Sequence, residues 1–260
     1  MHKFLILIFL FPISIFANDI KTIHVFVALC DNKNQGIVPV PEKLGNGEDL
    51  INNLYWGAAY GVKSFFKNQK DWKLVFNSLD VNENVLERVV FWNENKNAYL
   101  VADAYRGITI KAATSDLIDS INGTRNDSIH FQNKLIKTNI QLALAANADL
   151  LAYVGHNGLM DFSLEIKNEK KQWIKQKPVI LLACYSKKYF SNLLEQERVN
   201  PILWTNGLLA PEAYVLHSAI NSWLNKDTSI ITRNRAASAY NHYQHCGLKG
   251  AKKLFSSKWD

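Results

Sequence analysis

Residues 150–158, LLAYVGHNG, and residues 178–186, PVILLACYS, are the two stretches that decide the predicted fold. In each stretch a short apolar run without charged residues leads directly into a polar turn. Continuous apolar runs of this length are typical of strands buried on both faces, as in parallel sheets. The two runs therefore predict neighbouring strands of a parallel sheet, one ending at His156 and the other at Cys184.

The rest of the chain alternates in the same way between strand-like and helix-like patterns. Further strands are expected at residues 23–30, 73–76, 99–102 and 201–204, with a strand or a helix at 86–91. Apolar residues at helical spacing predict helices at residues 54–66, 115–121, 131–147 and 211–224, and from Asp227 or Thr228 to Gly247. Strands separated by helices indicate an α/β fold with a mainly parallel sheet flanked by helices on both faces.

The composition is that of a compact protein with a large core. Of the 260 residues, 48% are apolar, and the 12 glycines and 6 prolines are too few for long disordered tracts. The sequence contains no internal repeat and no low-complexity linker. We therefore expect a single domain that covers residues 18–260.

The N-terminus has the pattern of a secretory signal. Lys3 precedes an apolar run at residues 4–11, and the small residue Ala17 comes before polar Asn18. A membrane anchor is the alternative, but the run is shorter than the ~20 residues that a span needs. The sequence predicts a signal peptide at residues 1–17, cleaved after Ala17, no membrane span in the mature chain, and a periplasmic or secreted protein.

The formal net charge of +7 at pH 7 is spread along the chain. Its densest part is at the C-terminus, where the lysines fit a solvated helix face better than a nucleic-acid surface. We expect no nucleic-acid partner, and the sequence does not indicate an oligomeric state.

The three cysteines, Cys30, Cys184 and Cys246, cannot all pair within one chain. In an oxidising compartment Cys184 is favoured as the free thiol, which leaves Cys30 and Cys246 to form a disulfide. The alternative is that all three are reduced and buried. The sequence leaves both alternatives open.

Polar residues follow five of the predicted strands, and a parallel sheet brings such residues to one edge, where ligands bind. His156 and Cys184 are the candidate catalytic pair, because a thiol attacks as thiolate and an adjacent imidazole can take its proton. Taken singly, each is more simply a core cysteine or a loop histidine, but their joint placement favours a site. Candidate pocket residues around them are Asp31, Asp103, Trp204, Thr205 and Asn206.

The His-Gly-type turn after one apolar strand and Ala183-Cys184-Tyr185-Ser186 after the other resemble the caspase-like cysteine peptidases. That group includes caspases, legumains, gingipains and clostripain. The resemblance covers residues 20–225 by order of elements, and only the two short motifs are specific. It implies a catalytic dyad of His156 and Cys184 on adjacent strands and a peptide or protein substrate.

The chain departs from the family pattern directly after the histidine, where Asn157 precedes Gly158 and the family usually has glycine. The backbone N–H of Cys184, with that of Asn157 or Gly158, would then bind the oxyanion. Asp31, Asp103 and Asp161 are candidates to orient His156, although the resemblance requires no such residue.

Two further groups were weighed as binding residues. Glu212 could meet a basic substrate side chain, but a helix-dipole role in the first turn of the predicted helix is favoured. His242, His245 and Cys246 share a predicted helix and have no identifiable fourth ligand, so we predict no metal site and no cofactor.

Together these features predict an exported cysteine hydrolase, a peptidase that uses a Cys184/His156 dyad for acyl transfer. The alternative is a catalytically silent periplasmic binding or envelope-associated protein that holds a ligand in the same crevice at the strand ends.

Overall fold

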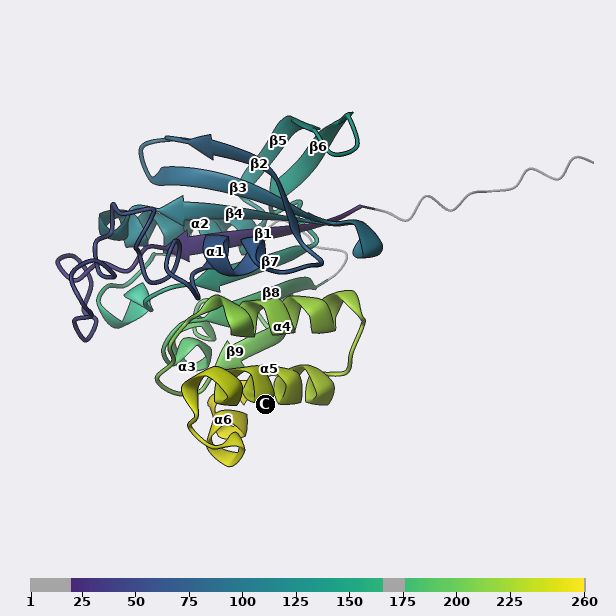
Figure 1. Ribbon diagram of the computed structural model, residues 1–260. Coiled ribbons are helices and arrows are strands. Elements are labelled where there is room, and N and C mark those ends of the chain that lie inside the picture. Colours follow the sequence, from purple (N-terminus) through teal and green to yellow (C-terminus); the bar gives the residue numbers. More distant parts are fainter. Residues whose placement is uncertain (1–19, 166–175, 260) are drawn as a thin grey trace, which may run out of the picture.

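The computed structural model describes residues 20–165 and 176–259, so the predicted signal peptide at residues 1–17 lies outside the described residues. Its centre is an eight-stranded sheet in the order β10-β9-β8-β7-β1-β4-β3-β2 (Figure 1). The parallel strands are β1 (Lys21–Ala28), β4 (Ala98–Tyr105), β7 (Leu150–Val154), β8 (Lys177–Leu182) and β9 (Val199–Thr205). Antiparallel strands extend the two edges: β2 (Lys73–Leu79), β3 (Val85–Asn93) and β10 (Phe255–Ser256). The chain is therefore an α/β protein with a large, mostly parallel sheet.

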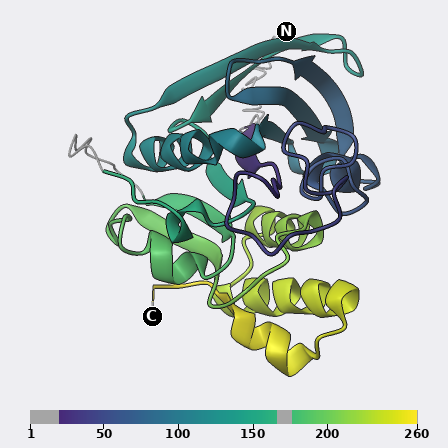
Figure 2. The same ribbon diagram turned by 90° about the vertical axis from the view of Figure 1, so that its left-hand side faces the viewer.

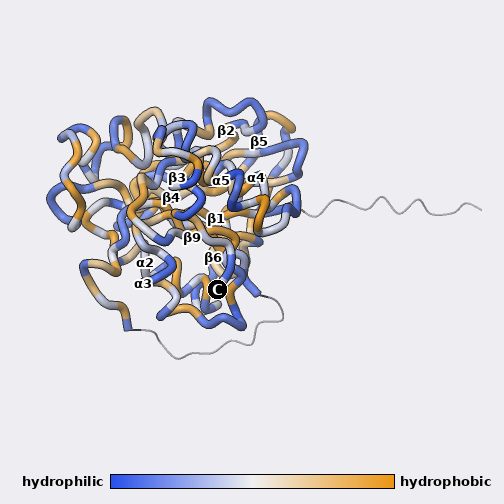
Figure 3. The backbone as a smooth tube through the Cα atoms, turned by 90° about the horizontal axis from the view of Figure 1, so that it is seen from below, coloured by the Kyte–Doolittle hydropathy of each residue, from blue (hydrophilic) through white to orange (hydrophobic). Residues whose placement is uncertain are grey.

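Side chains that alternate along β1 belong to two separate core clusters. Ile23, Val25 and Val27 pack in one cluster with residues of α1 (Val62–Lys67), α4 (Ala213–Leu224), α5 (Ser229–Gln244) and α6 (Leu248–Leu254). Phe26 and Ala28 pack in the other with residues of α2 (Ile110–Asn122) and α3 (Ser186–Phe190). Successive side chains of a strand point to opposite faces, and β1 is buried on both from Thr22 to Ala28. Figure 3 shows hydrophobic residues gathered at the central strands. No helix in the described ranges is long and apolar enough to cross a membrane.

The expected strands are present. Residues 23–30, 73–76, 99–102 and 201–204 fall largely within β1, β2, β4 and β9, and residues 86–91 form strand β3 rather than a helix. The two apolar runs that opened the sequence analysis are β7 and β8, and they pair in parallel.

The helix predicted at residues 131–147 is wrong. This region forms a hairpin of β5 (Asn126–Asn133) and β6 (Thr138–Ala145). Ile140, Leu142 and Leu144 are buried alternately against aromatic and aliphatic residues of β3 and β4. These residues also fit part of a helical pattern. They form a strand because, as a strand, they pack against the apolar surface of β3 and β4.

Three helix boundaries also differ from the prediction. The first helix begins only at Val62, because the side chain of buried Asn53 bonds the backbone of Cys30, Asn46 and Tyr55 and holds the preceding residues in turns. Helix α2 begins at Ile110 instead of residue 115. Thr228 caps α5 as predicted, but α5 ends at Gln244 and the separate helix α6 follows Gly247.

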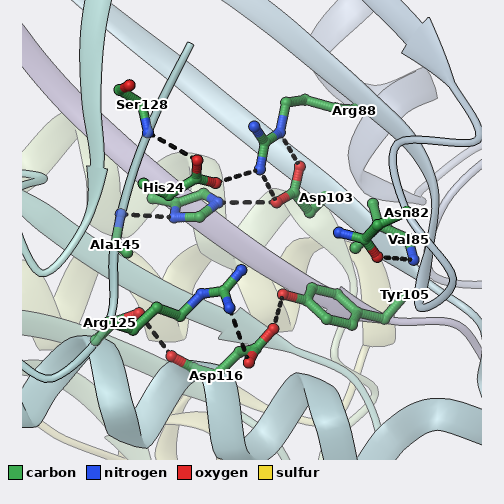
Figure 4. Close-up of polar contacts among 12 residues, drawn as sticks. His24, Asn82, Val85, Arg88, Asp103, Tyr105, Asp116, Arg125, Ser128 and Ala145 are labelled. Atoms are coloured by element: carbon green, nitrogen blue, oxygen red, sulfur yellow. Dashed lines mark hydrogen bonds and ion pairs between the residues drawn. The ribbon is translucent and has the colours of Figure 1, made fainter.

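A buried ionic network joins three strands of the sheet to the hairpin (Figure 4). Arg88 of β3 donates two hydrogen bonds to Asp103 of β4, from Nε to Oδ1 at 2.6 Å and from Nη2 to Oδ2 at 2.8 Å. His24 Nε2 of β1 lies 3.0 Å from Asp103 Oδ2, and His24 Nδ1 accepts the N–H of Ala145 in β6 at 3.1 Å. Arg88 also donates to Asp127 of β5 at 2.9 Å.

This network corrects the predicted place of Asp103. Strand β4 continues to Tyr105, so Asp103 is a fully buried residue within the strand and does not project from its end. Burial alone would raise the pKa of Asp103, but the hydrogen bonds and charges of Arg88 and His24 outweigh burial and hold that pKa well below its ordinary value.

Asp103→Asn should destabilise the protein at pH 7, because it leaves Arg88 buried with only the partly exposed Asp127 as a charged partner. We expect a loss of about 3 kcal/mol in the free energy of unfolding, measured by urea denaturation. Since a lowered carboxyl pKa stabilises the fold above the ordinary value of about 4, the difference from wild type should shrink as the pH falls below that value. Asp127→Asn is the control and should cost less than about 1 kcal/mol. An Asp103→Asn protein as stable as wild type would contradict this account.

Candidate functional site

The register of β7 and β8 brings His156 and Cys184 to matched positions. The paired residues run from Leu151↔Val179 to Val154↔Leu182, a constant offset of 182 − 154 = 28 residues. His156 and Cys184 have the same offset, 184 − 156 = 28, and each lies two residues beyond the last pair. Both residues therefore lie at the carboxyl edge of the sheet, onto which Figure 2 looks.

This edge is where an open parallel sheet binds ligands. Along the chain, β4 lies on one side of β1 and β7 lies on the other, so the order of strands reverses at β1. Crevices form at such reversals, beyond the carboxyl ends of the strands. His156 follows the strand directly beside this point.

Gly155 makes the turn after β7 feasible. Its φ is +150°, and a Cβ there would lie 2.8 Å from the carbonyl oxygen of Ala28 in β1. Only glycine fits this close approach without displacing the backbone of β1. The Gly155 N–H donates to Leu182 of β8 at 3.3 Å, which extends the pairing of the two strands by one residue.

Asp161 orients the imidazole of His156. His156 is buried, and its Nε2 lies 2.7 Å from Asp161 Oδ2. The carbonyl oxygen of His156 accepts the hydroxyl of Tyr153 at 2.8 Å. With Nε2–H assigned as the donor to Asp161, the neutral ring keeps its lone pair on Nδ1. Of the three aspartates weighed for this role, Asp161 is the one that contacts His156.

The long loop at residues 29–61 also contacts the Asp161 carboxylate and helps to position it. The Gly36 N–H donates to Asp161 Oδ2 at 3.0 Å, so one carboxylate oxygen serves both the loop and His156. A Cβ at residue 36 would overlap the Asp161 carboxylate. An alanine at this position would therefore displace the Asp161 carboxylate.

Cys184 stands on a sharp strand-to-helix turn. Tyr185 is in the left-handed conformation, with φ 50° and ψ 33°, and α3 begins at Ser186. The half-buried Cys184 sulfur accepts the N–H of Leu209 at 3.4 Å and lies 3.5 Å from the Leu209 carbonyl oxygen. In the described part of the chain, no hydrogen bond joins this thiol to His156.

Asn157, the residue that departs from the caspase-like pattern, ties the two turns together. Its side chain is fully buried, with Nδ2 donating to the Cys184 carbonyl at 2.7 Å and Oδ1 accepting the N–H of Leu159 at 3.2 Å. Among the described residues, the backbone N–H groups of Asn157, Gly158 and Cys184 meet no acceptor. Asn157 and Gly158 are buried, whereas Cys184 is half-buried.

Trp204 and Thr205 lie beneath the site and do not form pocket walls. Both are fully buried, because β9 continues through Thr205. Trp204 donates to the Lys258 carbonyl at 3.0 Å, and the Thr205 hydroxyl bonds Ser186 Oγ at 3.0 Å. Thr205 thus braces the turn that carries Cys184.

The remaining pocket candidates, Asp31 and Asn206, bond to other residues than His156 and Cys184. Asn206 is exposed and donates to the Lys253 carbonyl at 3.1 Å. Asp31 lies just beyond the end of β1, as predicted, but its carboxylate accepts backbone and side-chain N–H groups of the next residues. It lines a cavity of about 310 Å³ formed mainly by residues of the 29–61 loop.

All three cysteines are free, so the Cys30–Cys246 disulfide is absent from the structure. Cys30 is buried and Cys246 is exposed, which also differs from the alternative of three buried thiols. Burial raises the pKa of Cys30 to about 11 and keeps it a thiol at neutral pH. Within the described ranges no group of three His, Cys, Asp or Glu side chains could hold a metal ion, and His242, His245 and Cys246 are exposed.

Sequence reasoning did not identify the contact of Leu209 with the thiol, which had no signal because it joins residues 25 apart along the chain. It named Asp161 as one of three candidates to orient His156, and the structure shows the contact of Asp161 with His156.

Asn157→Ala should lower the free energy of unfolding by about 2 kcal/mol, because it leaves the Cys184 carbonyl without its partner. Urea denaturation at pH 7 measures this. Asn206→Ala, at the exposed end of β9, is the matched control and should change stability by less than about 0.5 kcal/mol. Equal effects of the two substitutions would show that Asn157 does not join the turns.

Comparison with protein-family models, with curated proteins and with solved structures found no match for this chain. The candidate site is therefore defined by its own side chains: His156, Asn157, Asp161 and Cys184.

Proposed function

We propose that this protein is an exported cysteine hydrolase, a peptidase in which Cys184 and His156 form the catalytic dyad. The observation that carries the proposal is the matched position of the two residues, each two residues beyond the paired ends of β7 and β8. A nucleophile, a base and a residue that orients the base are the parts that such a site requires. Cys184, His156 and Asp161 supply them at one edge of the sheet.

The proposed reaction is acyl transfer. The Cys184 sulfur attacks the carbonyl carbon of the substrate while His156 Nδ1 takes the thiol proton. The oxyanion is bound by the N–H of Cys184 and that of Asn157 or Gly158, each donor contributing about 3 kcal/mol. His156 then protonates the departing amine, which leaves a thioester on Cys184. Water activated by His156 hydrolyses the thioester and restores the thiol.

We extend the proposal to a caspase-like architecture with helices on both faces of the sheet. Its support is the division of the core, in which alternate side chains of β1 pack with α1, α4, α5 and α6 on the one hand and with α2 and α3 on the other. The order of the proposed dyad, histidine after one strand and cysteine after the next, agrees with the same architecture.

A peptide or protein is the proposed substrate class. Large apolar side chains are exposed on loops that follow the carboxyl ends of all five parallel strands. Side chains of this kind suit contacts with an extended peptide on either side of the attacked bond. They are Val38, Ile51, Ile108, Met160, Tyr185 and Leu208.

Export to the periplasm or the medium is proposed from the sequence of the N-terminus. The predicted cut after Ala17 would leave three residues before β1 begins at Lys21. Cleavage there would therefore remove no residue of the sheet.

A binding function without catalysis is the second candidate, and one observation favours it. The Cys184 sulfur bonds the backbone of Leu209, while His156 is bonded to Asp161. In this alternative the same edge holds a ligand for a periplasmic or envelope-associated protein. Catalytic hydrogen bonds often form only when substrate binds, so reactivity is the property that separates the two functions.

His156→Ala should suppress the reaction of Cys184 with iodoacetamide. The mature protein carrying Cys246→Ser is used, because Cys246 is exposed and would also react. We expect the alkylation rate at pH 7, followed by intact mass, to fall roughly a hundredfold when the base is removed. His242→Ala, an exposed histidine on α5, is the matched control. A Cys184 that does not react in the folded protein, or reacts equally without His156, would favour the binding function.

Asp161→Asn should weaken the same reaction by roughly tenfold, because the imidazole loses the carboxylate that orients it. Gly36→Ala should act in the same direction, since its Cβ would displace that carboxylate. Gly250→Ala, with open space around residue 250, is the matched control. Urea unfolding checks that each variant is folded. Wild-type rates in both Asp161→Asn and Gly36→Ala would remove Asp161 from the proposed mechanism.

A further inference from the structure

Two pairs of large apolar side chains are exposed at the amino edge of the sheet, opposite the edge that carries the candidate site. Leu135 and Ile136, in the turn between β5 and β6, are 55% and 42% exposed. Ile230 and Ile231, in the first turn of α5, are 72% and 41% exposed. Single exposed apolar residues are common, but adjacent pairs that belong to none of the core clusters point to a surface outside the chain.

The fold places both pairs on the same side of the molecule. The hairpin turn lies near the amino end of β4, because Asn133, the last residue of β5, donates to the hydroxyl of Tyr99 at 3.2 Å. Helix α4 follows the carboxyl end of β9 and returns along the sheet, so α5 begins at the amino edge. In Figure 1 the start of β1, the hairpin turn and the start of α5 all lie on the right, whereas the loops after β1 and β7 lie on the left.

The hairpin turn does not need apolar side chains for its own structure. The Leu135 N–H donates to Oδ1 of buried Asn133 at 3.1 Å, and the Thr138 hydroxyl donates to the Ile136 carbonyl at 3.1 Å. Both contacts use only the backbone of Leu135 and Ile136. Turns are usually built from glycine and small polar residues, and exposed apolar side chains gain nothing by burial here. A partner that buries Leu135 and Ile136 would explain them.

Basic side chains flank both apolar pairs. Lys134 and Lys137 stand directly before and after the hairpin pair, and Lys226 and Arg233 lie on either side of the α5 pair. All four are exposed, and within residues 20–165 and 176–259 none of them forms an ion pair.

Three carboxylates of the same edge are already paired with other cations. These pairs are Lys21 with Asp149, Lys73 with Glu94, and Arg235 with Asp227. The charge left over beside the apolar side chains is therefore positive. An anionic lipid bilayer matches this combination, because it offers hydrocarbon beneath a negatively charged layer of head groups.

We infer that the amino edge of this protein binds the surface of an anionic lipid bilayer. Leu135 and Ile136, together with Ile230 and Ile231, enter the boundary between head groups and acyl chains, and the flanking cations contact the lipid phosphates. The carboxyl edge with Cys184 then faces away from the bilayer and stays accessible. This inference holds for the hydrolase and for the binding function alike, because it uses no residue of the candidate site.

Vesicle flotation of the full mature chain tests the inference. We expect the wild type to float with vesicles that contain phosphatidylglycerol. Pure phosphatidylcholine vesicles should bind it roughly tenfold or more weakly, because their surface carries no net negative charge. Added salt should weaken the binding to phosphatidylglycerol, since it screens charges at the surface.

The double substitution Leu135→Ser with Ile136→Ser should weaken binding to the phosphatidylglycerol vesicles by roughly tenfold or more, because the turn no longer brings apolar surface into the bilayer. The matched control is Val38→Ser with Ile51→Ser, which removes two exposed apolar side chains from the loop at the opposite edge. The control should bind as wild type does.

Lys134→Gln with Lys137→Gln should weaken the same binding by roughly thirtyfold, because two cations beside the bilayer are lost. Lys249→Gln with Lys253→Gln, both exposed on α6, removes the same charge and is the matched control. Urea midpoints close to wild type show that each variant is folded.

Three results would overturn the inference. The first is a wild-type protein that does not float with phosphatidylglycerol vesicles, and the second is equal loss of binding in the hairpin variants and their controls. The third is wild-type vesicle binding by Leu135→Ser with Ile136→Ser. If that variant also changes the mass in solution, measured by light scattering, the surface is an interface between copies of this chain.

Discussion

The parallel pairing of β7 with β8 is the constraint on which the candidate site depends. Neighbouring strands lie about 4.8 Å apart, so residues at matched positions beyond two paired strands are neighbours before any side-chain contact forms. The offset of 28 residues in this pairing equals the spacing of His156 and Cys184. Gly155 allows the first turn to leave β7 against β1, and Asn157 then bonds the second turn. The other contacts of the site adjust an arrangement that the backbone already imposes.

The two buried carboxylates of Asp103 and Glu212 differ in the groups that donate hydrogen bonds to them. Asp103 is enclosed by Arg88 and His24, and every oxygen of its carboxylate meets a donor. Its charge therefore fastens β1, β3, β4 and the β5–β6 hairpin together. Glu212 has neutral donors on one oxygen and no cation among the described residues. The first carboxylate is neutralised by its partners, whereas the second is bonded by neutral donors alone in the described part of the chain.

The candidate site combines segments that are far apart in the sequence. The Gly36 N–H meets Asp161 across 125 residues, and Leu209 meets Cys184 across 25. Sequence patterns located the ends of β7 and β8 because hydrophobic periodicity is a local property that reports burial directly. They did not select Asp161 over Asp31 and Asp103, since all three follow or lie within apolar runs and only the folded loops decide which one reaches His156. The same limit applies to Trp204 and Thr205, which follow the pattern of a strand end yet lie beneath the surface.

The sequence by itself determined the class of sheet, the strands that compose it and the placing of His156 and Cys184 beyond two of them, because uninterrupted apolar runs can be satisfied only by burial on both faces. The tertiary structure alone decided that residues 126–145 form a hairpin, that Asp103 is enclosed by Arg88 and His24, and that Glu212 is buried against the neutral donors Tyr214 and Gln244. Each of these outcomes depends on which surfaces and charges meet across long stretches of chain. A local pattern carries no information about such partners until the sheet has brought them together.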